Sequence, residues 1–317
     1  MESTTVVKPH ALCFPHPGQG HINHMMKLAM LLHARGFYIT FVNTEFKNDR
    51  ITGSGGAMGL NDLEDFKLES IPNGLPPDLG RTQDAVELDK SVLDAMRERI
   101  RCPMYPIGSF ASFSQSESID HLQSVSMSLW KEEDACVEWL NDKEPKSVVY
   151  VNFGSATVLT RNQLNEFSWG LANSQRPFIW VIHEGPVIGE SATIGKVFMK
   201  VLSHPAVGGF LTHSGWNSTF ESISSGMLTI CWPFFADQQT NCWYVYKELG
   251  IGMEINNGVK RQDVKDLIRE LMGGKKGKEM QLKAKKLKES SKSALQIGGS
   301  SYDNFERLLK EMLLEKH

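Results

Sequence analysis

The stretch that decides the fold is HPAVGGFLTHSGWNSTFESISSGMLTICWPFFADQQTNC, which runs from His204 to Cys242. It contains an apolar strand pattern, VGGFLT, then the turn residues HSG, a helix-forming segment and a second apolar run, MLTIC. A strand that leads through a glycine turn into a helix is typical of parallel α/β sheets, which bind ligands beyond the carboxyl ends of their strands. The free N–H groups at such a helix start favour a phosphate. The stretch therefore predicts a site for a phosphorylated ligand.

The rest of the second half repeats this alternation. Residues 147–155, SVVYVNFGS, predict a buried strand, and residues 177–183, PFIWVIH, predict the next one. Between them, residues 160–174 have the amphipathic pattern of a helix with Thr160 as its N-cap. The strand IGMEI and two or three amphipathic helices follow. This order predicts right-handed βαβ units on a nearly complete parallel sheet.

The first half carries fewer strands. Apolar runs at 11–15 (ALCFP), 38–44 (YITFVNT) and 66–72 (FKLESIP) predict three strands, and a helix is predicted at 22–34. A doubly wound domain usually has about five or six strands, and each βαβ unit takes roughly 30 residues or more. The first domain is therefore expected to be incomplete.

Three parts of the chain are expected. Residues 1–110 form the incomplete first domain, and residues 111–130, which include the end of the Ser-rich run SFASFSQSES, form a linker. Residues 131–317 form the second domain together with the C-terminal helices. The predicted fold class is α/β, with two Rossmann-like doubly wound domains that face each other.

Composition excludes several functions for the 317 residues. The hydrophobic share of 41% and the charged share of 22% are those of a globular protein, and a net charge of -3 gives no basis for nucleic-acid binding. The N-terminus lacks the pattern of a signal peptide, and no apolar run approaches the roughly 20 residues of a membrane span. The five cysteines are scattered and include no CxxC pair. A cytoplasmic protein with reduced thiols is expected.

The segment from His213 to Gln238 resembles the donor-binding signature of the plant family-1 UDP-glycosyltransferases. This resemblance implies two facing Rossmann-like domains of the GT-B type, with an acceptor-side first domain and a second domain that binds a UDP-sugar. It also implies roles for side chains at matching positions. The diphosphate contacts are assigned to His213, Asn217 and Ser218, the ribose contact to Glu221, the sugar contacts to Trp216, Asp237 and Gln238, and a cleft-side position to Ser155. From the residues alone, Ser218 and Glu221 also fit an S-x-x-E capping box, and both interpretations can hold together.

His21 is the candidate catalytic residue. It lies in HPGQGHINHMM, where the loop after the first strand meets a helix whose dipole favours a neutral imidazole that can accept a proton from an alcohol. A histidine that only hydrogen-bonds within a glycine-rich turn is the simpler alternative. The resemblance implies that His21 is the catalytic base. The trio of His16, His21 and His24 lacks the i, i+4 spacing of a zinc helix, so no metal site is expected.

The chain departs from the family pattern in two places. Gly195 stands where the family has a tryptophan that stacks on uracil, and Phe198 stands where it has a glutamine. After residues 88–91 the chain passes directly to a segment that resembles the end of the family's first domain. No residue can be assigned to the aspartate that orients the catalytic histidine. The chain therefore resembles an internally deleted member of the family.

Two functions follow from these observations. The first is an inverting, metal-independent transfer of glucose from UDP-glucose, as co-substrate, to a hydroxyl of a small lipophilic plant metabolite, with no further cofactor. The alternative is a catalytically inactive or weakly active truncated product that at most binds nucleotide or a paralogue. A nicotinamide-dependent enzyme is disfavoured because the chain has no G-x-G-x-x-G fingerprint.

Overall fold

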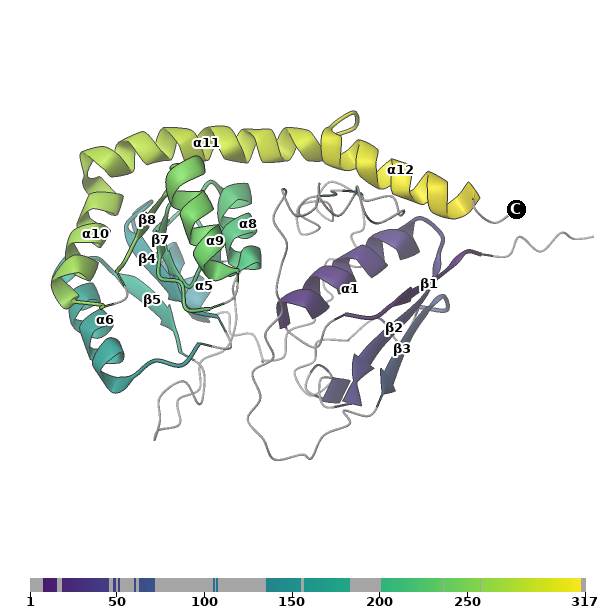
Figure 1. Cartoon of the computed structure of the whole chain (residues 1–317), viewed down its shortest axis with the longest axis horizontal. Coiled ribbons are helices and arrows are strands. Elements are labelled where there is room, and N and C mark those ends of the chain that lie inside the picture. The colour runs from purple at the N-terminus through teal and green to yellow at the C-terminus, as the bar shows by residue number, and fades with distance from the viewer. Residues whose placement is uncertain are drawn as a thin grey trace, which may run out of the picture. The chain divides into compact units, whose positions relative to one another are not determined.

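The computed structural model describes most of the chain as two compact units (Figure 1). The described residues are 8–15, 19–45, 48–49, 51, 60, 63–71, 105, 107, 135–154, 157–182, 201–235, 237–256 and 258–314. Unit 1 comprises Met1–Gln83, Pro103–Lys131 and Ala294–His317, and unit 2 comprises Asp84–Cys102 and Glu132–Ser293. The predicted linker, 111–130, lies outside the described residues. The division differs from the predicted ranges in that the last 24 residues of the chain group with unit 1.

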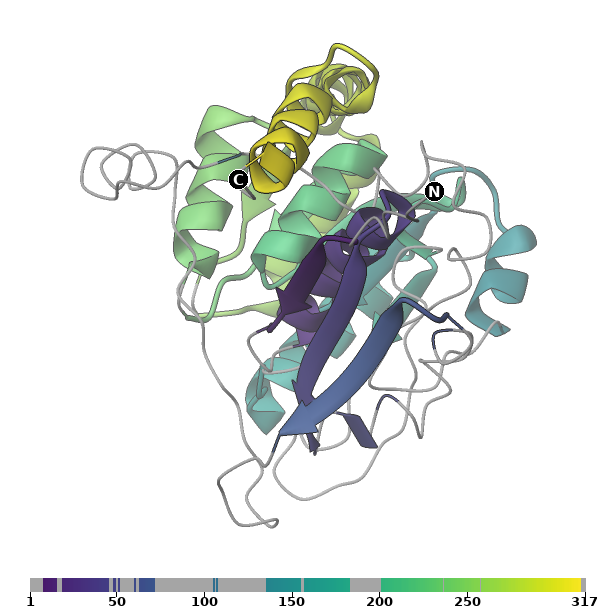
Figure 2. The ribbon, with the colours of Figure 1, turned by 90° about the vertical axis from the view of Figure 1, so that its right-hand side faces the viewer.

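Unit 1 contains a three-stranded parallel sheet with the order β1-β2-β3 (Figure 2). Its elements in chain order are β1 His10–Cys13, α1 Gln19–Ala34, β2 Tyr38–Thr44 and β3 Phe66–Ile71. All three strands and the helix were predicted from apolar runs and helical spacing. Because a doubly wound domain usually has about five or six strands, the described part of unit 1 is incomplete, as the sequence predicts.

The C-terminal helix α12, Ser300–Leu314, belongs to the core of unit 1. Phe305 and Leu309 are buried in one apolar cluster with strand residues such as Ile39 and Phe41. Arg35, just after α1, forms an ion pair with Glu306, and its guanidinium lies 5.4 Å from the centre of the Phe305 ring. The end of the chain therefore supplies part of the core that the N-terminal strands need.

Unit 2 contains a five-stranded parallel sheet with the order β5-β4-β6-β7-β8. The strands are β4 Val148–Asn152, β5 Phe178–Val181, β6 Val207–Thr212, β7 Thr229–Cys231 and β8 Gly252–Glu254. All five residues of β4 are buried, as expected for a central strand covered on both faces. Alternate residues of β4 enter different cores: Val149 and Val151 lie in one cluster, and Val148 and Tyr150 lie in the other.

Helices cover both faces of this sheet. They are α5 Ala135–Asn141, α6 Arg161–Ser174, α8 Trp216–Ser225, α9 Gln238–Trp243, α10 Arg261–Gly273 and α11 Lys275–Leu295, with a π-helical turn, Tyr244–Glu248, after α9. Figure 1 shows α6 and α10 side by side at one side of the sheet, and they are in extensive contact. Thr160 caps α6 as predicted: its Oγ1 accepts from the Gln163 N–H, and Gln163 Oε1 accepts from the Thr160 N–H.

Two further predictions concern the membrane and the thiols. Within the described part of the chain, no helix is both long and apolar enough to cross a membrane. The cysteines that the structure describes are free thiols, namely Cys13, Cys136, Cys231 and Cys242.

Candidate functional site

The strand order of unit 2 reverses between β4 and β6. The chain passes from β4 outward to β5 and then crosses to the other side of β4 to form β6. In open α/β sheets, ligands bind at the carboxyl ends of the strands at such a reversal. Gly154 follows β4 and His213 follows β6, so both residues lie at this point of the sheet.

The His213 imidazole lies between two glycines of separate loops. A Cβ added to Gly154 would lie 2.6 Å from His213 Nε2, and a Cβ added to Gly215 would lie 2.5 Å from the same atom. Side chains do not approach this closely, so a larger residue at either position would displace the ring. Gly154 also has a φ of +75°, which glycine adopts without strain. The two glycines therefore leave the space that the imidazole occupies.

Polar side chains at the strand ends hold the two glycine turns. The Gly154 N–H donates to Asn152 Oδ1 at 2.8 Å, and the Ser214 N–H donates to Thr212 Oγ1 at 3.2 Å. Ser214 has a φ of 63°, which costs about 1–2 kcal/mol outside glycine. Asn152 and Thr212 are not among the site residues predicted from the sequence. Both could have been predicted from the sequence, because Asn and Thr side chains at the end of a strand commonly hydrogen-bond the backbone two residues further on.

Helix α8 begins directly after this turn, with Gly215 as its N-cap. In the described residues no side chain caps α8, so the first N–H groups of the helix are available to a ligand. The capping box proposed for Ser218 and Glu221 is wrong. Because the helix starts at Trp216, Ser218 is its third residue and Glu221 its sixth, too far along to cap each other.

The predicted ligand residues of α8 occupy its first two turns. Trp216 is 41% exposed, Asn217 is half-buried, and Ser218 and Glu221 are buried. Glu221 is a carboxylate in a largely buried position one helical turn beyond Ser218. The structure therefore brings Trp216, Asn217 and Ser218 together with His213 at one helix start.

Asp237 and Gln238 lie in the loop after β7 and at the start of α9. The Gln238 side chain is buried, and its Oε1 accepts from the N–H groups of Phe234 at 2.8 Å and Phe235 at 3.2 Å. Both lone pairs of that oxygen are thus used, and its NH₂ group is the part left for a ligand. The half-buried Asp237 carboxylate accepts from Asn241 Nδ2 at 2.5 Å.

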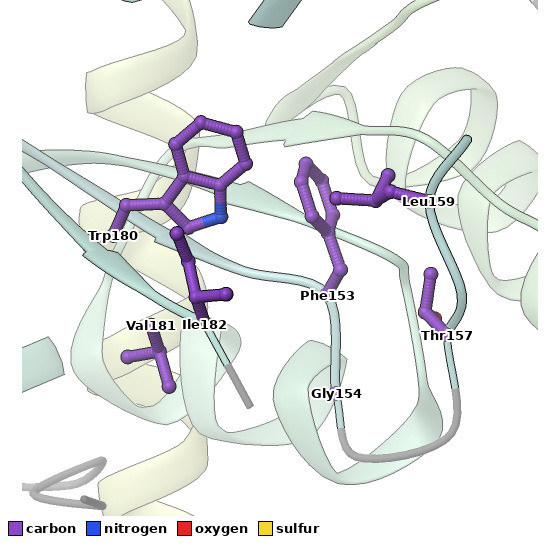
Figure 3. A pocket seen from close by; sticks show the side chains of 7 residues that line it. All are labelled: Phe153, Gly154, Thr157, Leu159, Trp180, Val181 and Ile182. Carbon is purple, nitrogen blue, oxygen red and sulfur yellow. The ribbon is translucent and has the colours of Figure 1, made fainter. Parts of the chain in front are cut away.

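A small apolar pocket adjoins Gly154 at the carboxyl ends of β4 and β5. Figure 3 shows the rings of Phe153 and Trp180 on its walls; they meet edge to face with centroids 6.2 Å apart. Thr157 also lines the pocket, and its buried Oγ1 has no hydrogen-bond partner among the described residues. A buried hydroxyl without a partner is costly, so Thr157 is a further candidate for ligand binding that the sequence analysis missed. Ser155, Gly195 and Phe198 lie outside the described residues.

His21 lies in unit 1, as the third residue of α1, and is half-buried. His24, one turn later, has its Nδ1 3.0 Å from the Gly20 carbonyl oxygen, so Nδ1 carries the proton. His16 lies outside the described residues. Among the residues that the structure describes, no three His, Cys, Asp or Glu side chains form a group that could hold a metal ion.

His24 predicts an acid-sensitive step in the stability of unit 1. Burial, and then the charge of Lys27, lower the pKa of His24 from 6.5 to about 4. Between pH 6.5 and pH 4 the unfolded state binds a proton at His24 that the folded state does not bind. The contribution of His24 to the free energy of unfolding is therefore fully present above pH 6.5 and is lost as the pH decreases toward 4. The loss approaches about 3 kcal/mol. Urea unfolding followed from pH 7 to pH 4 is expected to show this slope. His24→Gln, which keeps a donor for the Gly20 carbonyl, should remove it; an unchanged slope would contradict the assignment.

Comparison with known proteins identifies the family. Residues 131–290 match the family model described as "UDP-glucoronosyl and UDP-glucosyl transferase". The chain is 35% identical over 469 residues to 7-deoxyloganetin glucosyltransferase of Catharanthus roseus, with 96% of each protein covered. It is 33% identical over 472 residues to (R)-mandelonitrile beta-glucosyltransferase of Prunus dulcis, with 97% of this chain and 98% of that protein covered.

The solved structures show the same fold. UGT2 of Phytolacca americana, complexed with UDP-2fluoro-glucose and pterostilbene, has a TM-score of 0.70 at 22% identity, and the match covers 98% of this chain and 100% of that chain. The predicted GT-B type of fold is thereby confirmed. An alignment of 469 residues exceeds the 317 residues of this chain, so roughly a third of the alignment has no counterpart here. The chain therefore belongs to the plant family-1 UDP-glycosyltransferases, enzymes that transfer a sugar from a UDP-sugar, and its first domain is incomplete.

Proposed function

We propose that the chain binds UDP-glucose at the strand reversal of unit 2, with the diphosphate at the start of α8. The observation that carries this proposal is the His213 imidazole, set between Gly154 and Gly215 beside an uncapped helix start. N–H groups and the positive end of the helix dipole stabilise a diphosphate. Asn217 and Ser218 add side-chain donors, and Glu221 accepts from the ribose hydroxyls. The buried Thr157 hydroxyl adds a polar group on the β4 side. Ser155, which lies outside the described residues, is assigned to the donor from the family resemblance alone.

The sugar lies against Asp237 and Gln238 in this proposal, with Trp216 covering it. The Gln238 oxygen is engaged by two backbone N–H groups, so this residue donates through its NH₂ group. The carboxylate oxygens of Asp237 act as acceptors. A donor next to an acceptor suits the neighbouring hydroxyls of glucose, each of which both donates and accepts.

The proposed reaction is the transfer of glucose to a hydroxyl of a small lipophilic plant metabolite. His21 takes the hydroxyl proton, the oxygen attacks the anomeric carbon, and the bond from that carbon to the diphosphate breaks as UDP leaves. Attack opposite the leaving group inverts the configuration at the anomeric carbon. The start of α8 and His213 offset the charge that develops on UDP, which is the role a metal ion would otherwise have. The names of the two relatives, which refer to 7-deoxyloganetin and (R)-mandelonitrile, suggest acceptors of this size.

A second candidate is a protein that binds the donor without turning it over. The observation in its favour is the missing third of the alignment, together with the lack of an assignable aspartate to orient His21. In the family pattern such a carboxylate fixes the tautomer and the direction of the imidazole. In this second candidate function, the donor site described above binds UDP-glucose but no sugar is transferred.

One experiment separates the two candidates. The full chain is incubated with UDP-glucose and hydroxylated terpenoid, phenolic and cyanohydrin acceptors, glucosides are detected by mass spectrometry, and UDP binding is followed by thermal shift. Glucoside formation that His21→Ala abolishes and the exposed control His10→Ala retains supports the enzyme. Binding of UDP without any glucoside supports the second candidate. A chain that neither binds UDP nor forms a glucoside contradicts both.

A further inference from the structure

Asn241 connects the two loops of the donor site through one amide group. It lies in α9 and is only 6% exposed. Its Nδ2 donates to Asp237 Oδ2 at 2.5 Å and to the Ser214 carbonyl oxygen at 3.0 Å. A carboxylate and a carbonyl can only accept, so the NH₂ end of the amide must face both of them. Both protons of that NH₂ group are therefore used, and the side chain is held at two points.

The two partners come from different parts of the site. Ser214 stands in the turn between β6 and α8 and has a left-handed backbone, with a φ of 63°. Its neighbours are His213 and Gly215, which define the diphosphate side of the site. Asp237 stands in the loop after β7, on the sugar side. Asn241 thus ties the carboxylate of one loop to the backbone of the other.

An aspartate at a helix start usually accepts a hydrogen bond from one of the first backbone N–H groups of the helix. Asp237 occupies the N-cap position of α9, yet within the described residues it forms no side-chain capping hydrogen bond. Its Oδ2 is directed to Asn241 instead, and the backbone N–H of Asn241 donates to the Asp237 carbonyl at 2.9 Å. Oδ2 is therefore held in place, and Oδ1, which has no hydrogen-bond donor among the described residues, can accept from a ligand.

We propose that Asn241 is a positioning residue that directs the Asp237 carboxylate toward the sugar of the donor. This role rests on the proposed donor site. Without Asn241, the carboxylate is free to rotate, and its acceptor oxygen no longer stays in line with a sugar hydroxyl. The start of α8 keeps its own hydrogen bonds, such as the one from the Thr219 N–H to the Gly215 carbonyl at 2.9 Å. Loss of Asn241 should therefore weaken the binding of the sugar and leave the binding of the diphosphate unchanged.

Titration calorimetry of the full chain with UDP and with UDP-glucose tests this role. Asn241→Ala is expected to lower the affinity for UDP-glucose about tenfold, equal to about 1.4 kcal/mol. The affinity for UDP should stay within about twofold of that of the unmodified chain. Gln239→Ala, an exposed position on the same helix, is the matched control and should change neither affinity. In an Asp237→Asn background, Asn241→Ala should cause little further loss, because the residue acts through Asp237.

The outcomes are distinct. If the unmodified chain binds neither nucleotide, the proposed donor site fails and the positioning role fails with it. If the unmodified chain binds both nucleotides and Asn241→Ala leaves the ratio of the two affinities unchanged, the donor site stands and the positioning role is overturned. If Asn241→Ala does not fold, Asn241→Ser gives the same comparison, because its hydroxyl has one proton for two acceptors and should still weaken UDP-glucose selectively.

Discussion

Replacing Gly215 with alanine is expected to lower the affinity for UDP by about tenfold or more. The new Cβ would lie 2.5 Å from His213 Nε2, so the imidazole must leave its place beside the helix start. Gly215 has an ordinary φ of -59°, so the effect comes from the collision and not from backbone strain. A hydrogen bond to a charged group contributes about 1.5–3 kcal/mol, which corresponds to about tenfold to a hundredfold in affinity.

Titration calorimetry with UDP measures this effect, and Gly258→Ala is its control. A Cβ on Gly258 would meet no atom within 4 Å, so this variant should bind UDP like the unmodified chain. Unchanged UDP binding by Gly215→Ala would show that His213 does not contact the diphosphate. Equal losses in both variants would point to a general effect of alanine at glycine positions.

Replacing Phe305 with alanine is expected to destabilise unit 1 by about 3–5 kcal/mol. Phe305 is fully buried in α12, in the same core as the N-terminal strands. Its ring also lies beside the Arg35 guanidinium, which the truncation would leave over a cavity. Because the described part of unit 1 has only a three-stranded sheet, its stability depends strongly on this one helix.

Hydrogen exchange of β1, β2 and β3 measures the effect where it should occur. The amide protons of these strands are expected to exchange faster in Phe305→Ala, while those of β4 and β6 in unit 2 keep their rates. Ile297→Ala is the matched control, since this apolar side chain is 88% exposed just before α12. Loss of protection in unit 2 as well, or none in unit 1, would contradict the assignment of α12 to the core of unit 1.

Much of the fold was predictable because it depends on local patterns. The strand predicted at 38–44 is observed as Tyr38–Thr44, and the buried run at 147–155 contains β4 with every residue buried. Thr160 caps α6 through a contact that spans three residues. Hydrophobic periodicity, apolar runs and helix caps each involve only a few neighbouring residues, so they can be identified directly from the sequence.

Other features were not predictable because they join distant residues. The S-x-x-E pattern of Ser218 and Glu221 suggested a helix start that the structure places at Trp216, because the Gly215 turn begins the helix earlier. The Gln238 oxygen is engaged by backbone N–H groups that only the loop conformation brings to it. Asn241 reaches Ser214 across 27 positions, a contact that spacing alone does not reveal.

The sequence by itself determined the family and the parallel α/β architecture, because apolar periodicity and the segment from His213 to Gln238 are local properties of the chain. Only the tertiary structure decided that Gly154 and Gly215 enclose the His213 ring, and that Asn241 links the loops of Ser214 and Asp237. The physical reason is the strand order: β6 lies beside β4 although β5 comes between them in the chain. Which loops meet at the site is set by that crossover, and side-chain contacts follow from it.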